Sequence, residues 1–209
     1  MKTAAIVQAR LGSTRLPRKV LKRINGKTLI EIIYSRLCKT KLVDKIIFSI
    51  PNTKENNELE AFLKKKKYLY FRGDENDVLS RYYQTAKKFK IDNIVRITGD
   101  CPLVDYKTVD EFIKVFLKEK KDYVSNCNPW TYPDGLDTEV FSFKLLSHAQ
   151  RKAKKHQRLN GGVLISFLKE NKNFDISNIN CPIQNISKYR LTVDEEADFI
   201  LIKKIYDKF

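Results

Sequence analysis

Short apolar runs alternate with amphipathic stretches over the first hundred residues, and this alternation constrains the fold more than any other feature. Each run has the length of a strand, whereas each stretch between runs repeats its apolar residues at helical spacing. Continuous apolar runs are typical of strands buried on both faces of a parallel sheet. We therefore predict an α/β domain with a mainly parallel central sheet flanked by helices. The expected strands cover residues 3–8, 45–50, 68–73 and 93–99, and the expected helices cover 27–39, 56–66 and 77–89.

The second half of the chain is less regular. Pro129, Pro133 and Gly135 interrupt the pattern. The other expected elements are strands at 138–143 and 189–194 and helices at 109–119, 142–157, 163–171 and 195–209. No internal repeat, low-complexity linker or second domain is evident in the sequence. We predict that residues 1–209 form one domain, in which 125–170 is an insertion.

The chain carries 41 Lys and Arg residues against 25 Asp and Glu residues, a formal net charge of +16 in 209 residues. Such an excess favours anionic partners, which include nucleotides, sugar acids, nucleic acids and acidic membrane surfaces. The alternative is that most of the excess lies on solvated faces, because the chain is generally rich in Lys, Ile and Asn. A local cationic cluster must therefore be distinguished from the general bias.

Cysteine spacing and hydropathy exclude several classes of protein. The four cysteines are far apart and show no CxxC or His-rich pattern, so neither a zinc site nor a disulfide framework is indicated. No apolar stretch reaches the roughly 20 residues of a membrane span. The first apolar run is too short for a signal peptide, and Arg10 follows it directly. We expect a cytoplasmic protein without a membrane span.

The densest cationic cluster follows the first expected strand, in the segment QARLGSTRLPRK. Gly12 permits close backbone approach to an anion, and the hydroxyl residues that follow it add donors. Arg10, Arg15 and Lys19 can neutralise phosphate charge. The alternative is a basic, solvated loop. The segment matches neither the P-loop pattern nor the GxGxxG dinucleotide fingerprint, and we favour phosphate binding.

Two acidic residues stand at the ends of expected strands. Asp100 comes directly after the strand that ends at Gly99, where a carboxylate and substrate phosphates can share a Mg²⁺ ion. The alternative is that Asp100 caps the next helix. Asp194 ends the last expected strand, and the sequence supports its role as a helix cap nearly as well as a role in binding a cation.

The segment FRGDENDVLSRY provides a further polar cluster at the end of a strand. Its charged side chains include Arg72, Asp77 and Arg81. One interpretation of Asp77 is that it only begins the helix that follows.

The segment TYPDGLDTEVFS carries three acids within an irregular stretch that leads into a strand. If residues 137–141 are extended, Asp137 and Glu139 project from the same face. Two acids on one face are costly unless they meet a cation or bind hydroxyl groups. A sugar or polyol is the ligand that this pattern favours, and a polar surface turn is the alternative.

These motifs together resemble one family. QARLGSTRLPRKVL resembles the signature of the spore coat polysaccharide cytidylyltransferase-like family, which is related to the CMP-Kdo and CMP-sialate synthetases. The chain departs from that pattern at Arg18, where the family usually carries Gly. The resemblance implies a Rossmann-like, GT-A-like nucleotidyltransferase domain. The matching positions are Ala9, Arg10, Gly12, Ser13, Arg15, Pro17 and Lys19.

The resemblance also implies roles for individual residues. Arg10, Arg15, Lys19 and Asp100 would be catalytic, and Asp100 and Asp194 would hold Mg²⁺. The implied acceptor site consists of Tyr132, Asp134, Asp137, Glu139 and Arg158. The implied nucleotide site consists of Gln8, Ala9, Arg10, Leu11, Gly12, Ser13, Arg15, Lys19, Arg72, Asp77, Thr98, Gly99 and Asp100. Within it, the resemblance of FRGDENDVLSRY to a family segment makes Arg72 and Asp77 candidates for contacts with a base or a phosphate, and Arg81 a weaker candidate.

One segment departs from the family pattern. An Arg-Glu-His-Val-Thr-like stretch is expected after the helix that follows the acidic segment, and this chain has HQRLNGGV instead. Arg158 matches the Arg, whereas Leu159 and Asn160 replace the Glu and the His. If that stretch helps to select the acceptor, the acceptor of this protein differs.

The resemblance implies transfer of CMP from CTP to an acidic sugar or a phosphorylated small metabolite, with release of pyrophosphate, for surface polysaccharide synthesis. Insertion 125–170 would bind the acceptor and form a homodimer. One rival class is a catalytically silent relative that acts as a subunit or regulator, although both candidate metal acids are present. The other is a nucleic-acid-binding protein, which no RNP-type, KH or zinc-finger pattern supports.

Overall fold

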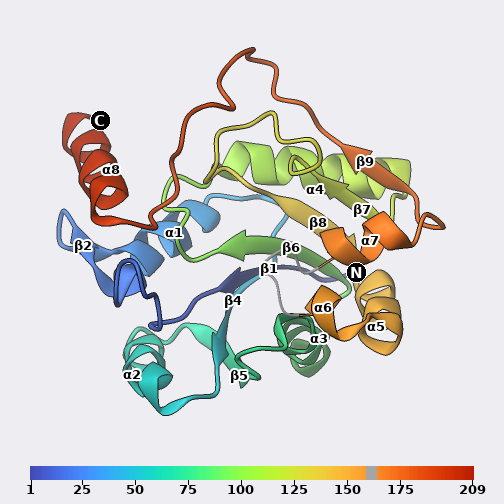
Figure 1. Cartoon of the computed structure of the whole chain (residues 1–209), viewed down its shortest axis with the longest axis horizontal. Helices are drawn as coiled ribbons and strands as arrows, with labels where there is room; N and C mark the ends of the chain where they lie inside the picture. Colours follow the sequence, from blue (N-terminus) through green and yellow to red (C-terminus); the bar gives the residue numbers. More distant parts are fainter. Residues whose placement is uncertain (159–163) are drawn as a thin grey trace.

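The computed structural model describes residues 1–158 and 164–209. Within these ranges the chain forms a sheet of seven strands in the order β5-β4-β1-β6-β8-β7-β9 (Figure 1). The strands are β1 (Thr3–Gln8), β4 (Lys45–Pro51), β5 (Leu69–Gly73), β6 (Asn93–Thr98), β7 (Tyr123–Ser125), β8 (Glu139–Ser142) and β9 (Ile176–Asn178). The helices are α1 (Leu29–Leu37), α2 (Asn57–Lys65), α3 (Val78–Phe89), α4 (Tyr106–Glu119), α5 (Phe143–Lys152), α6 (Lys155–Arg158), α7 (Ile165–Glu170) and α8 (Glu196–Lys208).

The parallel half of the sheet is built from the four strands that the apolar runs predicted. β1 is central and pairs in parallel with β4 on one side and β6 on the other, and β5 extends the sheet beyond β4. Residues 3–7 of β1 are buried on both faces, which explains the absence of polar alternation in that run. The predicted α/β fold with a mainly parallel central sheet is therefore confirmed.

The other half of the sheet contains antiparallel pairs that the sequence did not predict. β8 runs antiparallel to β6 and to β7, and β9 pairs in parallel with β7. β7 and β9 have three residues each, so neither is long enough for its hydrophobic pattern to distinguish a strand from a loop.

Helices cover both faces of the sheet. Apolar residues of α1, α2 and α4 pack with one another on one face, and those of α3, α5 and α7 pack on the other. The final helix α8 lies at one end of the sheet (Figure 1). There Val193 and Ile202 join Ile24, Leu29 and Ile32 in a separate small apolar cluster. The C-terminal helix is thereby attached to α1 and to a hairpin of β2 (Arg23–Ile24) and β3 (Lys27–Thr28).

Several local expectations were wrong. Residues 189–194 do not form a strand, because their neighbour is the irregular, proline-containing segment 133–137, with which Arg190 forms only an isolated bridge. The helix expected at 142–157 is divided, since Ala153 is extended and separates α5 from α6. The hairpin at Asn25-Gly26 was not predicted, although both residues adopt the positive φ typical of a tight turn.

No described helix is both long and apolar enough to cross a membrane. Residues 159–163, which include Leu159 and Asn160 of the divergent segment, lie outside the described residues.

Candidate nucleotide-binding site

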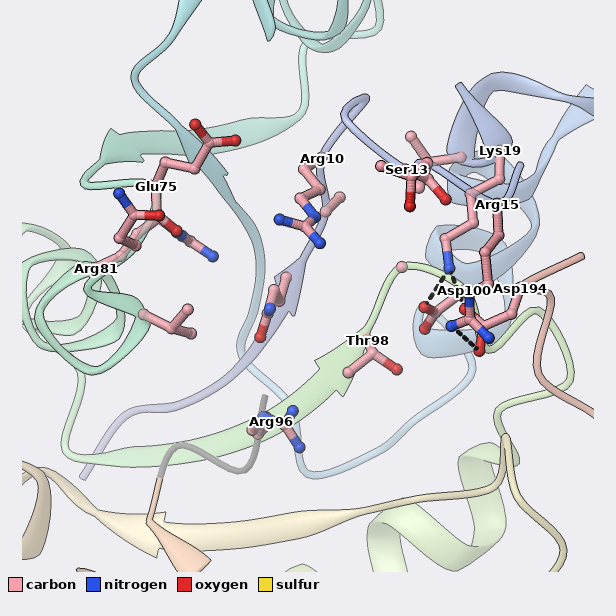
Figure 2. A pocket seen from close by; sticks show the side chains of 17 residues that line it. Arg10, Ser13, Arg15, Lys19, Glu75, Arg81, Arg96, Thr98, Asp100 and Asp194 are labelled. Atoms are coloured by element: carbon pink, nitrogen blue, oxygen red, sulfur yellow. Dashed lines mark hydrogen bonds and ion pairs between the residues drawn. The ribbon is translucent and has the colours of Figure 1, made fainter. Parts of the chain in front are cut away.

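A cavity of about 390 Å³ lies where β1 and β6 end. In a parallel sheet this carboxyl edge is where ligands bind. Figure 2 shows Arg15 and Lys19 pointing toward Asp100, which follows β6, and toward Asp194, whereas Arg10 lies between this group and Arg81. The full lining is Gln8, Ala9, Arg10, Ser13, Thr14, Arg15, Lys19, Val20, Glu75, Asn76, Val78, Arg81, Arg96, Thr98, Gly99, Asp100 and Asp194.

Gly99 brings the ends of the two central strands together. Its N–H donates to the carbonyl oxygen of Gln8 at 2.7 Å. A Cβ atom at this position would lie 2.9 Å from the same oxygen, closer than real Cβ atoms approach. A larger residue would therefore separate the loop after β1 from Asp100, which follows β6.

The centre of one end of the cavity is Lys19. Its Nζ lies 2.7 Å from Asp100 Oδ2 and 2.7 Å from Asp194 Oδ1, so two acids 94 positions apart in the sequence converge on one cation (Figure 2). Burial opposes the charge on Lys19, yet Asp100 and Asp194 raise the pKa of its ammonium above the usual value. Burial likewise opposes the charge of Asp100, and Lys19 outweighs it to lower the pKa of that carboxyl.

Asp194 is held in place by the chain on either side of it. The N–H of Val193 donates to the carbonyl oxygen of Asp100 at 2.8 Å. Arg15 and Arg190 approach Asp194 Oδ2 at 3.0 and 3.1 Å. Asp194 does not cap the last helix, because that helix begins with Glu195 and Asp198 in a capping box.

Asp100 is not a helix cap either, since Asp105 caps α4. Both acids are therefore available to a cation. Among residues 1–158 and 164–209, no group of three or more His, Cys, Asp or Glu side chains is arranged to hold a metal ion. Two carboxylates do suit Mg²⁺, which usually completes its coordination with water and substrate phosphates. The position of the Lys19 ammonium shows that the two acids stabilise positive charge between them.

Arg72 and Asp77, which the sequence placed in the nucleotide site, do not line this cavity. Arg72 pairs with Glu60 and donates to the carbonyl oxygen of Thr53 at 2.8 Å. Asp77 caps α3 by accepting from the N–H of Ser80 at 2.8 Å. The other carboxylate oxygen of Asp77 binds Arg158, 2.7 Å from its guanidinium, so Arg158 lies beside α3 rather than in an acceptor site.

Two buried arginines line the first cavity, of which sequence reasoning identified one only as a weaker candidate and did not indicate the other. Arg81, the weaker candidate, is 2% exposed and donates through Nη1 to the carbonyl oxygen of Glu75 at 3.1 Å. Arg96, on β6, was not a candidate at all. The sequence did contain a signal for Arg96, because an arginine within a strand buried on both faces must be paired or face a ligand. Leu11 and Gly12 belong to the loop but do not line the cavity.

A second cavity, of about 330 Å³, is lined by three of the predicted acceptor residues, Tyr132, Asp134 and Asp137, together with Trp130 and Ser187. Glu139 does not line it. This residue is 1% exposed, pairs with Arg96 across β6 and β8, and accepts from the Tyr123 hydroxyl at 2.8 Å. Asp137 and Glu139 therefore differ in environment despite their spacing, because Asp137 precedes the strand.

Backbone hydrogen bonds join the segment that lines the second cavity to the segment that leads to Asp194, which lines the first cavity. Asp134 and the segment that leads to Asp194 exchange two hydrogen bonds, from Asp134 N–H to Tyr189 at 3.1 Å and from Leu191 N–H to Asp134 at 2.6 Å. Gly135 makes this approach possible, since it has φ of 104° and a Cβ there would lie 2.5 Å from the backbone of Leu191. Burial, followed by the charge of Asp134, raises the pKa of Asp137 to about 6.

The family model described as cytidylyltransferase matches residues 4–208. An uncharacterised protein of Methanocaldococcus jannaschii is 37% identical over 212 residues, which cover 100% of this chain and 85% of that protein. The spore coat polysaccharide biosynthesis protein SpsF of Bacillus subtilis is 29% identical over 208 residues, covering 97% of this chain and 85% of SpsF.

Among solved structures, a cytidylyltransferase from Leptospira borgpetersenii superposes with a TM-score of 0.92 at 31% identity, covering 100% of this chain and 88% of that chain. The family match and this superposition both extend over nearly all of the chain, and the first cavity contains the signature loop from which the resemblance was drawn. The protein therefore belongs to the cytidylyltransferase family and is a CTP-dependent nucleotidyltransferase.

Proposed function

We propose that this protein transfers CMP from CTP to an acidic sugar or a phosphorylated small metabolite and releases pyrophosphate, as a step in surface polysaccharide synthesis. The observation that carries the proposal is the convergence of Asp100 and Asp194 on Lys19 within a cavity lined by Arg10 and Arg15. This arrangement provides both an anion site and a cation site at the edge of the sheet where a nucleotide binds. The name of the Bacillus subtilis relative supports the pathway.

The chemistry requires positioning and charge neutralisation but no protein nucleophile. Arg10, Arg15 and Lys19 bind the triphosphate and stabilise the charge that develops on pyrophosphate as it leaves. The rest of the nucleotide would contact other residues of the cavity lining, which include Gln8, Ala9, the buried Arg81, Thr98 and Gly99.

Asp100 and Asp194 would hold a Mg²⁺ ion. A bound Mg²⁺ neutralises the phosphates and makes the α-phosphorus more electrophilic. Lys19 holds the two carboxylates close together, since its Nζ lies 2.7 Å from an oxygen of each.

The acceptor binds in the second cavity, against Tyr132, Asp134 and Asp137. Residues 125–170 serve as the acceptor-binding and dimerisation part of a single domain, and the exposed Trp130 is a candidate for contact in a homodimer. We place the reaction in the cytoplasm, where CTP is available.

The decisive experiment measures Mg²⁺-dependent release of pyrophosphate. Four nucleotides are screened against a panel of sugar acids and phosphorylated metabolites, and CTP with one acceptor class should be active. Asp100→Asn and Asp194→Asn should each lower the rate about 100-fold or more, because each removes charge that binds the cation. The matched control is Asp207→Asn, an exposed residue of α8 that should retain full activity.

Two results would contradict the proposal. If both cavity variants retain the wild-type rate, the cation site is wrong. If no nucleotide releases pyrophosphate with any acceptor, the transfer reaction is wrong. Steep, salt-dependent binding of unrelated oligonucleotides without turnover would then favour the nucleic-acid-binding alternative.

A further inference from the structure

Asp137 has an environment that acceptor binding alone does not explain. It lies in the irregular segment before β8, at the second cavity. Its Oδ1 is buried and has no hydrogen-bond partner among the described residues. A buried polar atom without a partner is costly, which suggests that the missing partner belongs to a ligand.

The charges around Asp137 come from three parts of the fold. Asp134 precedes it in the same segment, Glu139 and Arg96 pair on the neighbouring strands, and Asp100 follows β6. Burial and the three acids favour its protonated form, whereas Arg96 favours the carboxylate. The pKa of about 6 that results lies near physiological pH, where a carboxylate is both largely ionised and able to take up a proton.

We propose that Asp137 accepts the proton of a hydroxyl group on the second substrate while that oxygen attacks the α-phosphorus of CTP. This assignment rests on the proposed CMP transfer and makes it more specific. The bond from the hydroxyl oxygen to the α-phosphorus forms, and the bond from the α-phosphorus to the bridging oxygen of pyrophosphate breaks. The hydroxyl proton moves to Asp137 and then to solvent, and pyrophosphate leaves with the bridging electrons.

The residues that line the second cavity favour a hydroxyl nucleophile over a phosphate monoester as the acceptor. They include two acids, Asp134 and Asp137, but no Lys or Arg in the described part of the chain. A phosphate monoester is already ionised at neutral pH, so as a nucleophile it needs no base. A hydroxyl group satisfies Asp137 Oδ1 by donating a hydrogen bond and becomes a better nucleophile when it loses its proton. The nucleophile is therefore a hydroxyl, and the product is CMP-linked rather than CDP-linked.

The test compares pH profiles of kcat/KM for wild type, Asp137→Asn and Asp134→Asn. The acceptor probes are 3-deoxy-manno-octulosonic acid, N-acetylneuraminic acid and glucose 1-phosphate, with water as the smallest hydroxyl nucleophile in slow CTP hydrolysis. Wild type should lose activity below pH 6, as Asp137 becomes protonated. Asp137→Asn should lower the rate at least about 100-fold and abolish this limb of the profile.

Asp134→Asn provides a control in the same cavity. It removes the neighbouring charge that contributes most to the raised pKa of Asp137, so the limb should move to lower pH while remaining visible. A purely structural role of Asp137 would not produce this shift. Trp130, the single tryptophan of the chain, lines the cavity and is 62% exposed, so its fluorescence reports acceptor binding separately from turnover. Asp137→Asn should still bind the reacting sugar.

The outcomes separate this inference from the function on which it rests. Pyrophosphate release with glucose 1-phosphate as the CMP acceptor would overturn the inference and leave CMP transfer intact. So would an Asp137→Asn variant that retains both the rate and the acidic limb. Absence of pyrophosphate release with every probe, water included, would instead overturn the transfer reaction, and the role of Asp137 would fall with it.

Discussion

At the scale of single residues, the backbone of Arg18 explains the one departure of the first loop from its family pattern. Arg18 has φ of 59° and ψ of 22°, a left-handed conformation that glycine adopts more easily than any other residue. Its guanidinium pairs with Glu58 on α2 and does not line the cavity. The extra positive charge therefore contributes nothing directly to phosphate binding. The sequence motif identified Arg18 as the position that departs from the family pattern, but only the structure shows the direction of its side chain.

The acidic residues show what sequence can and cannot specify at this scale. The interpretation of Asp77 as the start of a helix is confirmed, since Asp77 caps α3. This role was predictable because capping depends on residues that are close in the sequence. The same local signal was misleading for Asp100 and Asp194, since the actual caps lie one to five positions later, at Asp105 and Glu195. What places these two acids beside Lys19 is contact between distant parts of the chain, which no local pattern contains.

The environment of Asp137 predicts how protein stability depends on pH. Its pKa is about 6 in the folded protein and 3.8 in the reference state, so between these values the folded state binds more protons than the unfolded state. Stability at this site therefore falls as pH rises from about 4 to about 6. Asp137→Asn should increase the free energy of unfolding at pH 7 by up to about 3 kcal/mol and should have little effect at pH 4.

Urea unfolding of both proteins at pH 4, 5, 6 and 7 measures this difference. A stabilisation that is equal at pH 4 and pH 7 would contradict the assigned pKa, because it would reflect packing rather than ionisation.

At the scale of elements, the parallel strands and most helices were predictable because burial imposes a pattern over six to fourteen residues. β1 was predicted with its observed bounds, Thr3–Gln8. The antiparallel half of the sheet was not predictable from such patterns. β7 and β9 are strands only because β8 turns back beside β6 and offers an edge for pairing. Three residues that line the second cavity, Tyr132, Asp134 and Asp137, were candidates from the sequence, but the shape of the cavity was not predictable, since these residues lie in a segment without regular structure.

The ion pair between Arg96 and Glu139 links β6 to β8 at the junction of the two halves. Glu139 is 1% exposed and also accepts from Tyr123 on β7, so three strands share one buried carboxylate. Glu139→Gln should lower the free energy of unfolding by about 3 kcal/mol, because it leaves the charge of buried Arg96 uncompensated by that carboxylate.

Denaturant unfolding provides the measurement, and Glu58→Gln provides the matched control. Glu58 forms an exposed pair with Arg18, and removal of such a pair should cost at most about 1 kcal/mol. Equal losses in the two variants would show that the buried pair has no special role in joining the halves of the sheet.

At the scale of the whole molecule, the site joins parts of the chain that the fold brings together from both ends. Lys19 follows the first strand, Asp100 follows β6, and Asp194 precedes the last helix. α8 packs through Ile202 on the cluster that contains Leu29 of α1, so the C-terminal helix supports the position of Asp194. The net charge of +16 is spread over the surface, and what identifies the site is the convergence of these three segments.

Ligand binding across these segments should stabilise the entire chain. CTP with a divalent cation, at about 100 times its Kd, contributes about 2.7 kcal/mol to the free energy of unfolding. For a chain of 209 residues this corresponds to an increase in Tm of roughly 5–10 °C.

Ca²⁺ in place of Mg²⁺ tests binding under conditions in which turnover is slow, and thermal unfolding followed by circular dichroism gives the measurement. Asp194→Asn should abolish most of the cation-dependent part of the shift, because the proposed cation site connects to the C-terminal segment through Asp194. Asp207→Asn, at the exposed end of the same helix, should show the full shift. An equal cation-dependent shift in both variants would mean that the C-terminal segment takes no part in binding, and the cation would then have to be held by Asp100 and the phosphates alone.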